Sequence, residues 1–419
     1  MKFIIRGGKR LHGTIEVRGA KNSALKILAA SILFEHPLVV KNLPQIEDVF
    51  RMKELLEGLG VRIEDLGRRA WKIDPRGISE TKLNKEVAER FRASIVLAGP
   101  LLARKGKASF PHPGGCVIGK RPIDIFLSGW RAMGAAAEES RGGHEIRAKR
   151  LRGTEFFFRT ISVTGTETLM MTAALAHGTT VLKNAACEPE IQSLAEFLNA
   201  SGAHIKGAST SIIEIIGTGG TLLHAKKPFE VIPDRIETGS FLILGAALGN
   251  PLRVNHCNPE HLSALIAALR EAGVKVEIGP RWVSVRRPRE LRAVNVVTRE
   301  YPGFATDDQA PFTVLMTQAR GEAMIAETVH DSRLNYVDDL NRMGARIVPA
   351  DPHRIFVHGP TSLHGRDIES PDLRAGLAFV IAGLIAKGES TIGNIYQIDR
   401  GYEKIEERLQ KLGAEIQRE

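Results

Sequence analysis

One cysteine of this chain stands in a glycine-rich, basic stretch whose residue types can do chemistry. Residues 113–122 read PGGCVIGKRP, so Cys116 follows two glycines and precedes Lys120 and Arg121 by a few positions. Free loop amides and neighbouring cations stabilise an anion, whether that anion is a bound phosphate, a carboxylate or the thiolate of the cysteine itself. The stretch therefore predicts an anion site with a reactive thiol beside it.

The same stretch contains GxxxxGK, which falls one residue short of a nucleotide-binding P-loop. A P-loop needs a Ser or Thr after the Lys to bind Mg²⁺, and a strand that runs directly into the glycines. Arg121 occupies the hydroxyl position, and residues 110–113 read FPHP, which is no uninterrupted strand. We reject the P-loop and keep the anion site.

A second candidate for chemistry is Asp307, in the string FATDD of residues 304–308. A carboxylate can take the proton of a reacting hydroxyl as a general base. An Asp that follows a Thr is also often a helix N-cap, and these residues alone leave both roles open. The other cysteines, Cys187 and Cys257, form no CxxC with Cys116, so we predict neither a disulfide framework nor a cysteine-rich zinc site.

These residues must be positioned by a repeat of roughly seventy residues. Each copy reads as an apolar helix, a short β-like run, a polar turn, an amphipathic helix that ends in Gly, and a further β-like run. The helix-ending glycines are Gly60, Gly134, Gly202, Gly273, Gly344 and Gly413, and the polar turns contain Asn42, Asn184, Asn255 and Asn394. Six βα units follow, and we expect two domains of three units each.

The apolar patterns assign the helices to two kinds of position. Apolar residues at helical spacing predict amphipathic helices over residues 46–59, 191–200, 262–272 and 337–343. Residues 25–33, 169–175, 241–248 and 377–385 are apolar on almost all sides, so we expect these helices to be buried within each domain and surrounded by sheets. The long unit excludes a TIM barrel, which alternates strand and helix about every thirty residues.

Composition narrows the classes of function. The 419 residues include 58 Lys and Arg against 48 Asp and Glu, and 5% aromatics. A basic balance can indicate nucleic acid, an anionic membrane or small acidic substrates, or it can be an ordinary solvated surface. The positive charges are scattered and the aromatics few, which speaks against nucleic acid. No apolar run could cross a membrane, and the N-terminus lacks a signal-peptide core, so we expect a cytoplasmic protein without a membrane partner. The 13 His residues show no metal-binding spacing, so we predict no metal and no organic cofactor.

Several strings resemble the UDP-N-acetylglucosamine enolpyruvyl transferase (MurA) family, and the resemblance covers essentially the whole chain. They are RGAKNSALKILAA (18–30), FRASIVLAGPLLA (91–103), GGCVIGKRPID (114–124), PDRIETG (233–239), ATDDQA (305–310), DLRA (372–375) and IDRGYEKIE (398–406). The resemblance implies a two-domain inside-out α/β barrel of the EPSP synthase type, with six repeated βαβαββ units, three per domain. It implies a first domain over residues 22–232, which carries Cys116, and a second over 1–21 and 233–419, with the active site in the cleft between them.

The implied reaction transfers the enolpyruvyl group of phosphoenolpyruvate to the 3′-hydroxyl of UDP-N-acetylglucosamine and releases phosphate, the first committed step of peptidoglycan synthesis. EPSP synthase has no cysteine in this loop, so the PGGC string argues against shikimate phosphate as the acceptor. Another nucleotide sugar remains an alternative because the chain departs from the family at Val96, Phe126, Thr160 and Tyr301. A basic nucleic-acid-binding protein is the distant alternative. The residues predict no oligomeric state.

The resemblance also assigns residues to roles. Cys116 would protonate the methylene carbon of phosphoenolpyruvate or attack its C2 to form a covalent adduct. Asp307 would act as the general base. Arginine suits these anionic substrates because its fork binds carboxylate and phosphate through paired hydrogen bonds. The implied catalytic residues are Cys116, Asp307, Lys21 and Arg400; the phosphoenolpyruvate-binding residues are Lys21, Asn22, Arg121, Arg333, Arg374 and Arg400; the nucleotide-sugar-binding residues are Asn22, Arg92, Arg121, Pro122, Ile123, Asp124, Ile125, Ser162, Val163, Thr164, Asp307 and Val329.

Overall fold

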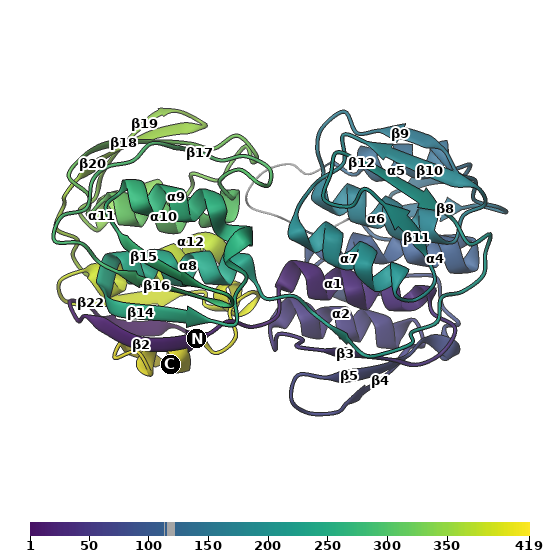
Figure 1. Cartoon of the computed structure of the whole chain (residues 1–419), viewed down its shortest axis with the longest axis horizontal. Coiled ribbons are helices and arrows are strands. Elements are labelled where there is room, and N and C mark those ends of the chain that lie inside the picture. Colours follow the sequence, from purple (N-terminus) through teal and green to yellow (C-terminus); the bar gives the residue numbers. More distant parts are fainter. Residues whose placement is uncertain (113, 115–121) are drawn as a thin grey trace. The chain divides into compact units, whose positions relative to one another are not determined.

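The computed structural model of the chain describes residues 1–112, 114 and 122–419. Its backbone contacts divide these residues into two compact domains (Figure 1). The first domain begins at Gly19 and ends at Ile232, and the second combines Met1–Arg18 with Pro233–Glu419. The contacts therefore place Lys21 in the first domain, whereas the division implied by the resemblance placed it in the second. Each domain has a separate cluster of buried apolar side chains.

The first domain surrounds its buried helices with three sheets, counted over the described residues. The buried helices are α1 (Lys21–Ala30), α4 (Ala98–Lys105) and α6 (Val163–Ala174). The other helices are α2 (Glu47–Gly58), α3 (Lys85–Ala88), α5 (Asp124–Ala132), α7 (Pro189–Asn199) and the 3₁₀ turns η1 (Ser31–Leu33), η2 (Pro75–Gly77) and η3 (Arg92–Leu97). The sheet orders are β13-β3-β5-β4, β6-β8-β7 and β11-β12-β10-β9. Their strands are β3 (Leu38–Lys41), β4 (Arg62–Asp65), β5 (Trp71–Asp74), β6 (Lys107–Phe110), β7 (Ala136–Ser140), β8 (Gly143–Arg147), β9 (Glu155–Phe157), β10 (Thr179–Lys183), β11 (His204–Lys206), β12 (Ile212–Ile216) and β13 (Phe229–Glu230).

The second domain repeats this plan. Its buried helices are α8 (Arg235–Leu248), α10 (Gln309–Met316) and α12 (Leu373–Ile385). The other helices are α9 (Ser263–Glu271), α11 (Val337–Arg342), α13 (Tyr396–Asp399), α14 (Ile405–Gln410) and the 3₁₀ turns η4 (Pro259–Leu262) and η5 (Thr306–Asp308). The sheet orders are β21-β22-β1-β23, β15-β16-β14-β2 and β17-β18-β20-β19. Their strands are β1 (Phe3–Arg6), β2 (Leu11–Glu16), β14 (Gly249–Asn255), β15 (Lys275–Gly279), β16 (Trp282–Arg286), β17 (Val296–Val297), β18 (Gly321–Ala326), β19 (Arg346–Asp351), β20 (Arg354–Gly359), β21 (Asp367–Glu369), β22 (Glu389–Gly393) and β23 (Glu415–Arg418).

Parallel strand pairs join one repeated unit to the next. The last strand of a unit pairs with the first strand of its successor, as β9 does with β10 and β17 with β18. Strand β13 returns to β3 and closes the first domain, and β2 pairs with β14 in the second. The N-terminal strand β1 lies between β22 and β23, so the start of the chain completes its last unit. The predicted six-unit α/β fold is confirmed.

The turns confirm most of the repeat. All six helix-ending glycines have positive φ, between 89° and 107°, and the N–H that follows each bonds back over five residues, as Val61 N does to Leu56 O at 3.0 Å. Glycine is favoured there because a Cβ disfavours left-handed backbone. Asn42, Asn184 and Asn394 are also left-handed, whereas in the turn that contains Asn255 the next residue, His256, takes this conformation. Asn255 instead ends β14 and donates to Glu16 Oε1 at 3.2 Å.

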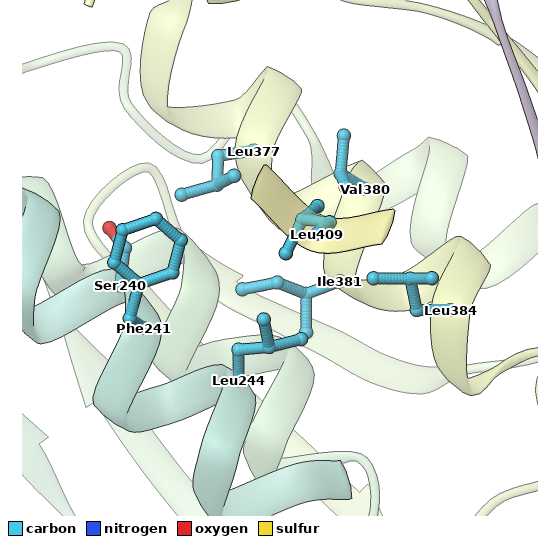
Figure 2. A pocket seen from close by; sticks show the side chains of 8 residues that line it. All are labelled: Ser240, Phe241, Leu244, Leu377, Val380, Ile381, Leu384 and Leu409. Atoms are coloured by element: carbon cyan, nitrogen blue, oxygen red, sulfur yellow. The ribbon is translucent and has the colours of Figure 1, made fainter. Parts of the chain in front are cut away.

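The four helices predicted as buried are buried, and two more share their position. Helices α4 and α10 were missed because Gly99 and Pro100 in one, and Gln309 and Thr313 in the other, break the apolar runs, although all four residues are buried. Figure 2 shows side chains of α8 and α12 meeting with Leu409 of α14, and their packing leaves no space for a water molecule. Among the described residues, none of the helices has the length and hydropathy that a membrane span requires.

Candidate functional site

In the second domain, Asp307 lies between two buried arginines. Its Oδ1 accepts from Arg333 Nη2 at 2.6 Å and its Oδ2 from Arg374 Nη2 at 3.1 Å. The arginine side chains are 4% and 6% exposed, while that of Asp307 is 23% exposed, so the carboxylate is the accessible member. Burial by itself would raise the pKa of Asp307, but Arg374 and Arg333 outweigh it and hold that pKa well below its usual range.

The helix-cap alternative for Asp307 does not hold. Neither η5 nor α10 receives a hydrogen bond from a capping side chain, and the two carboxylate oxygens bond to the guanidinium groups instead. Asp307 is therefore an ionised carboxylate that presents itself to solvent with two cations behind it. Such a group can accept a proton, and the same guanidinium groups can bind a substrate carboxylate or phosphate.

A chain of hydroxyl groups orients Arg374. Its Nη1 donates to Tyr402 Oη at 2.9 Å, Tyr402 Oη lies 3.0 Å from Ser240 Oγ, and Ser240 Oγ donates to Ile236 O at 2.9 Å. The Ser240 hydroxyl donates its one proton to the Ile236 carbonyl. Tyr402 must therefore donate to Ser240 Oγ and use a lone pair to accept from Arg374. Every proton in the chain has one direction, which fixes the guanidinium plane.

The side chains packed beside Ser240 are apolar. Of the side chains drawn in Figure 2, only that of Ser240 carries a polar atom, and the rest come from the apolar faces of α8, α12 and α14. Ser240 and Tyr402 are almost completely buried. Because both residues are buried, each hydroxyl depends on its protein partner, and burial raises the pKa of Tyr402 to about 12. Sequence reasoning missed both residues, although Tyr402 lies in the quoted string IDRGYEKIE.

Arg333 is held in a similar way by a second chain. Its Nη1 donates to Thr306 Oγ1 at 3.2 Å, and Thr306 Oγ1 donates to Glu327 Oε2 at 2.8 Å. Glu327 is 1% exposed, and its Oε1 accepts the backbone N–H groups of Val329 at 2.9 Å and His330 at 3.0 Å. The predicted nucleotide-sugar residue Val329 is thus tied through Glu327 to the residues that hold Asp307. Glu327 was not predicted.

The next residue, Asp308, has the opposite electrostatic environment. It is 3% exposed, and its Oδ1 has no hydrogen-bond partner among the residues that the structure describes. Helix α8 approaches it so closely that a Cβ added to Gly239 would lie 2.6 Å from Oδ1. Burial raises the pKa of Asp308 to about 8, against the attraction of Arg235. Two adjacent aspartates therefore differ in protonation at neutral pH, and only Asp307 is ionised.

Asp308 should make folding stability depend on pH. Its carboxyl keeps its proton in the folded protein up to about pH 8, whereas in the unfolded chain it loses the proton near pH 4. The free energy of unfolding should therefore fall as pH rises between these values, by on the order of 2–3 kcal/mol from pH 5 to pH 7 for this group alone. Urea unfolding of Asp308→Asn should lack this fall. Asp367 is exposed, so Asp367→Asn is the control and should keep the fall. If Asp308→Asn keeps the same fall, Asp308 is ionised in the folded protein.

The first domain contains a second group of predicted site residues, at the start of α1. Lys21 Nζ pairs with Asp48 Oδ2 of α2 at 2.7 Å, and the two side chains are 11% and 4% exposed. The pair fixes the Lys21 ammonium group at the N-terminus of α1, where the helix dipole places positive partial charge. Asn22 follows in the first turn of α1 and is half-buried. Asp48 was not predicted, because α1 and β3 separate it from Lys21 along the chain.

The other predicted residues of this domain also lie where helices begin. Ser162 caps α6 by accepting from Gly165 N at 3.1 Å, and Val163 and Thr164 form its first turn. Arg92 opens η3, and its Nη2 approaches Pro122 O at 3.5 Å. Ile123, Asp124 and Ile125 form the start of α5. Helices α1 and α6 both contact η3. A helix N-terminus can bind a phosphate through its free N–H groups.

A buried ion pair fixes α1 against α6. Lys26 Nζ lies 3.0 Å from Glu167 Oε2, and the two side chains are 7% and 0% exposed. Burial raises the pKa of Glu167 to about 7 despite Lys26, and nearby Glu190 and Glu188 add to the rise. The pair connects the helix that carries Lys21 and Asn22 to the helix that begins at Val163. Sequence reasoning missed it because both residues lie inside otherwise apolar helices.

Three predicted residues and the four departures remain. Arg400 follows α13 and donates from Nη1 to Gln397 Oε1 at 3.0 Å. Val96 and Phe126 are buried, so these two departures contribute to the core. Thr160 is exposed, and Tyr301 lies under the guanidinium of Arg235, 5.7 Å from Cζ to the ring centroid. Cys116 and Arg121 lie outside the described residues, as do all other residues of the anion-site stretch except Gly114 and Pro122.

Comparison with known proteins identifies the class. The sequence model of the family described as EPSP synthase (3-phosphoshikimate 1-carboxyvinyltransferase) matches residues 5–409. The enolpyruvyl transferase NikO from Streptomyces tendae has a TM-score of 0.90 and 26% identity, with 99% of this chain and 98% of that chain covered. An EPSP synthase from Acinetobacter baumannii has a TM-score of 0.75 at 19% identity, with both chains fully covered, which shows the fold alone. The chain belongs to the EPSP synthase family of carboxyvinyltransferases.

Within that class, full-length relatives point to one branch. The UDP-N-acetylglucosamine 1-carboxyvinyltransferase of Acidobacterium capsulatum is 46% identical over 100% of this chain and 96% of that protein. The protein of the same name from Desulforapulum autotrophicum is 44% identical over 100% of this chain and 99% of that protein. The chain is therefore a member of the UDP-N-acetylglucosamine 1-carboxyvinyltransferase family, and the predicted resemblance is confirmed.

Proposed function

We propose that the protein transfers the enolpyruvyl group of phosphoenolpyruvate to the 3′-hydroxyl of UDP-N-acetylglucosamine. The observation that carries this proposal is Asp307 held between Arg333 and Arg374 in a chain 46% identical to an enzyme named for this reaction. The product is the first committed intermediate of peptidoglycan synthesis, and we propose that the reaction takes place in the cytoplasm.

In the proposed mechanism, the residues of both domains act on the same pair of substrates. Asp307 takes the proton of the sugar 3′-hydroxyl while the hydroxyl oxygen bonds to C2 of phosphoenolpyruvate. Cys116 gives a proton to the methylene carbon of phosphoenolpyruvate. Loss of phosphate and of one methyl proton then restores the vinyl group. Arg333, Arg374 and Arg400 bind the phosphoenolpyruvate anion, and the helix starts of the first domain bind the nucleotide with Arg92 and Arg121.

The arginines tune Asp307 as substrate binds. In the structure both guanidinium groups bond to its carboxylate, which lowers its affinity for a proton. A substrate carboxylate competes for the same N–H groups, and every bond that it takes from Asp307 makes Asp307 a stronger base. Asp307 is therefore a stronger base when phosphoenolpyruvate is bound than in the empty site.

Phosphate release tests the acceptor directly. With phosphoenolpyruvate and UDP-N-acetylglucosamine, the protein should release phosphate and yield a product heavier by the enolpyruvyl group, detected by mass spectrometry. Shikimate 3-phosphate should give no release. Release only with a different nucleotide sugar would move the protein to another branch of the family. Release with none of these acceptors would overturn the proposal.

The hydroxyl chain behind Arg374 predicts a selective effect. Tyr402→Phe removes the acceptor of Arg374 Nη1 and frees the guanidinium plane, so KM for phosphoenolpyruvate should rise about tenfold while kcat changes less. Tyr336→Phe is the matched control, because Tyr336 is equally buried and its hydroxyl bonds to Thr313 at 2.9 Å. If both variants changed KM alike, or neither did, Tyr402 would have a structural role only.

A further inference from the structure

One end of the sheet β6-β8-β7 collects three side chains that the proposed reaction does not use. His144 lies on the central strand β8, with Phe110 of β6 opposite on one side and Glu139 of β7 opposite on the other. His112 follows Phe110 by two residues and so returns to the same face as Phe110. Residues directly opposite in antiparallel strands have neighbouring Cβ atoms, and long side chains also reach their diagonal neighbours. The register therefore brings two imidazoles and a carboxylate together.

The spacing of the two imidazoles fits a shared cation. His144 Nε2 lies 3.2 Å from His112 Nδ1, and the ring planes meet at 83°. Two nitrogens bound to one tetrahedral Zn²⁺ at 2.0–2.1 Å are about 3.3 Å apart. One ligand atom from each of His112, Glu139 and His144 lies within 4.8 Å of the other two. The geometry of metal ligation is thus nearly present before any ion binds.

The surroundings prepare both rings as ligands. His112 Nε2 lies 3.3 Å from Ser140 O, so Nε2–H donates to that carbonyl and Nδ1 keeps its lone pair toward His144. An imidazole that ligates a metal commonly gives its other N–H to a carbonyl in this way. His144 is 6% exposed and packs on Phe110, with the ring centroids 5.4 Å apart. Burial lowers the pKa of His144, which keeps the ring neutral at neutral pH.

We propose that His112, His144 and Glu139 bind one Zn²⁺ ion, with water at the fourth position. Neutral imidazole and carboxylate are ligands that Zn²⁺ prefers, and three protein ligands leave its tetrahedral shell open. Without metal, His144 Nε2–H donates to His112 Nδ1. Binding must move that proton to His144 Nδ1, which has no hydrogen-bond partner among the described residues. This cost limits the affinity, and the bound ion would hold the ends of the three strands together.

The chain offers a matched control group. Glu35, His36 and His224 also include two imidazoles and a carboxylate, with His224 Nε2 3.1 Å from Glu35 Oε2. All three are exposed, and the two imidazole rings lie 5.4 Å apart between centroids. This group lacks the buried ring of the proposed site, so it should bind Zn²⁺ more weakly.

Calorimetric titration of Zn²⁺ into the full chain tests the proposal. The tag-free Cys116→Ala chain is used, because a free thiol also binds Zn²⁺. One ion per chain should bind, His112→Ala should weaken binding at least about tenfold, and Glu139→Gln should weaken it less. His36→Ala should leave the affinity unchanged. Both site variants alter exposed side chains, so circular dichroism should show an unchanged fold.

Thermal unfolding gives a second measurement. Zn²⁺ should raise the Tm of the Cys116→Ala chain, and EDTA should reverse the rise, because an ion that binds only the folded state stabilises it. The same Zn²⁺ addition should leave the Tm of the His112→Ala form unchanged. No binding heat in the parent chain, or binding that is lost in His36→Ala and kept in His112→Ala, would overturn the proposal.

Discussion

Cys116→Ala should lower the rate of phosphate release by at least about a hundredfold, the contribution of a positioned general acid. The thiol lies beside Lys120 and Arg121 in the sequence, and these cations favour the thiolate in the empty site. Bound phosphate brings negative charge, which returns the proton to sulfur and makes it available to the methylene carbon. Steady-state kinetics with both substrates would measure the loss. Normal turnover of Cys116→Ala would reduce the stretch to an anion site without a catalytic thiol.

Chemical variants separate proton donation from packing. Cys116→Asp should keep substantial activity, because a carboxylic acid can also donate a proton, while Cys116→Ser should not. The epoxide fosfomycin should label the native chain at Cys116 and leave Cys116→Asp unlabelled. Cys187 and Cys257 serve as internal controls: burial raises the pKa of both thiols, that of Cys257 to about 11, so neither should react at neutral pH. Labelling of all three cysteines at similar rates in a mass spectrum would remove the special role of Cys116.

Asp307→Asn should also lower turnover by at least about a hundredfold, because an amide cannot accept the proton of the sugar hydroxyl. Both substrates should still bind, since Arg333 and Arg374 remain. Phosphoenolpyruvate should even bind more tightly, because its carboxylate no longer competes with Asp307 for the two guanidinium groups. Single-turnover kinetics and equilibrium binding would distinguish the two effects.

The neighbouring aspartate provides the control for this variant. Asp308→Asn replaces a carboxyl that is already protonated at neutral pH, so turnover should stay near that of the native protein. Loss of one partner of a buried ion pair can destabilise a protein by about 3–5 kcal/mol, so the thermal stability of Asp307→Asn must be measured beside its activity. Equal activity of Asp307→Asn and the native chain would assign Asp307 to holding the arginines alone.

The repeated architecture could be predicted from the sequence because its signals are local. A glycine that ends a helix needs positive φ wherever it stands, so six similarly spaced glycines reveal six units without any knowledge of how they pack. Apolar periodicity distinguished most buried helices from amphipathic ones for the same reason. It failed for α4 and α10, whose buried Pro100 and Gln309 look like surface residues until the surrounding side chains are known. It also could not choose between Asn255 and His256 in a turn where either residue can be left-handed.

Only the tertiary structure decided which groups share an environment. Asp307 and Asp308 are adjacent in sequence and chemically identical, yet one is ionised between arginines from distant segments and the other is neutral against α8. The hydroxyl chain through Tyr402 and Ser240 joins residues far apart in the chain, so no local pattern could reveal it. The sequence likewise could not show that His112 and His144 are neighbours, because they become neighbours only when strands β6 and β8 pair and place His144 opposite Phe110. Electrostatic and hydrogen-bond energies depend on distance in space, and a sequence records only distance along the chain.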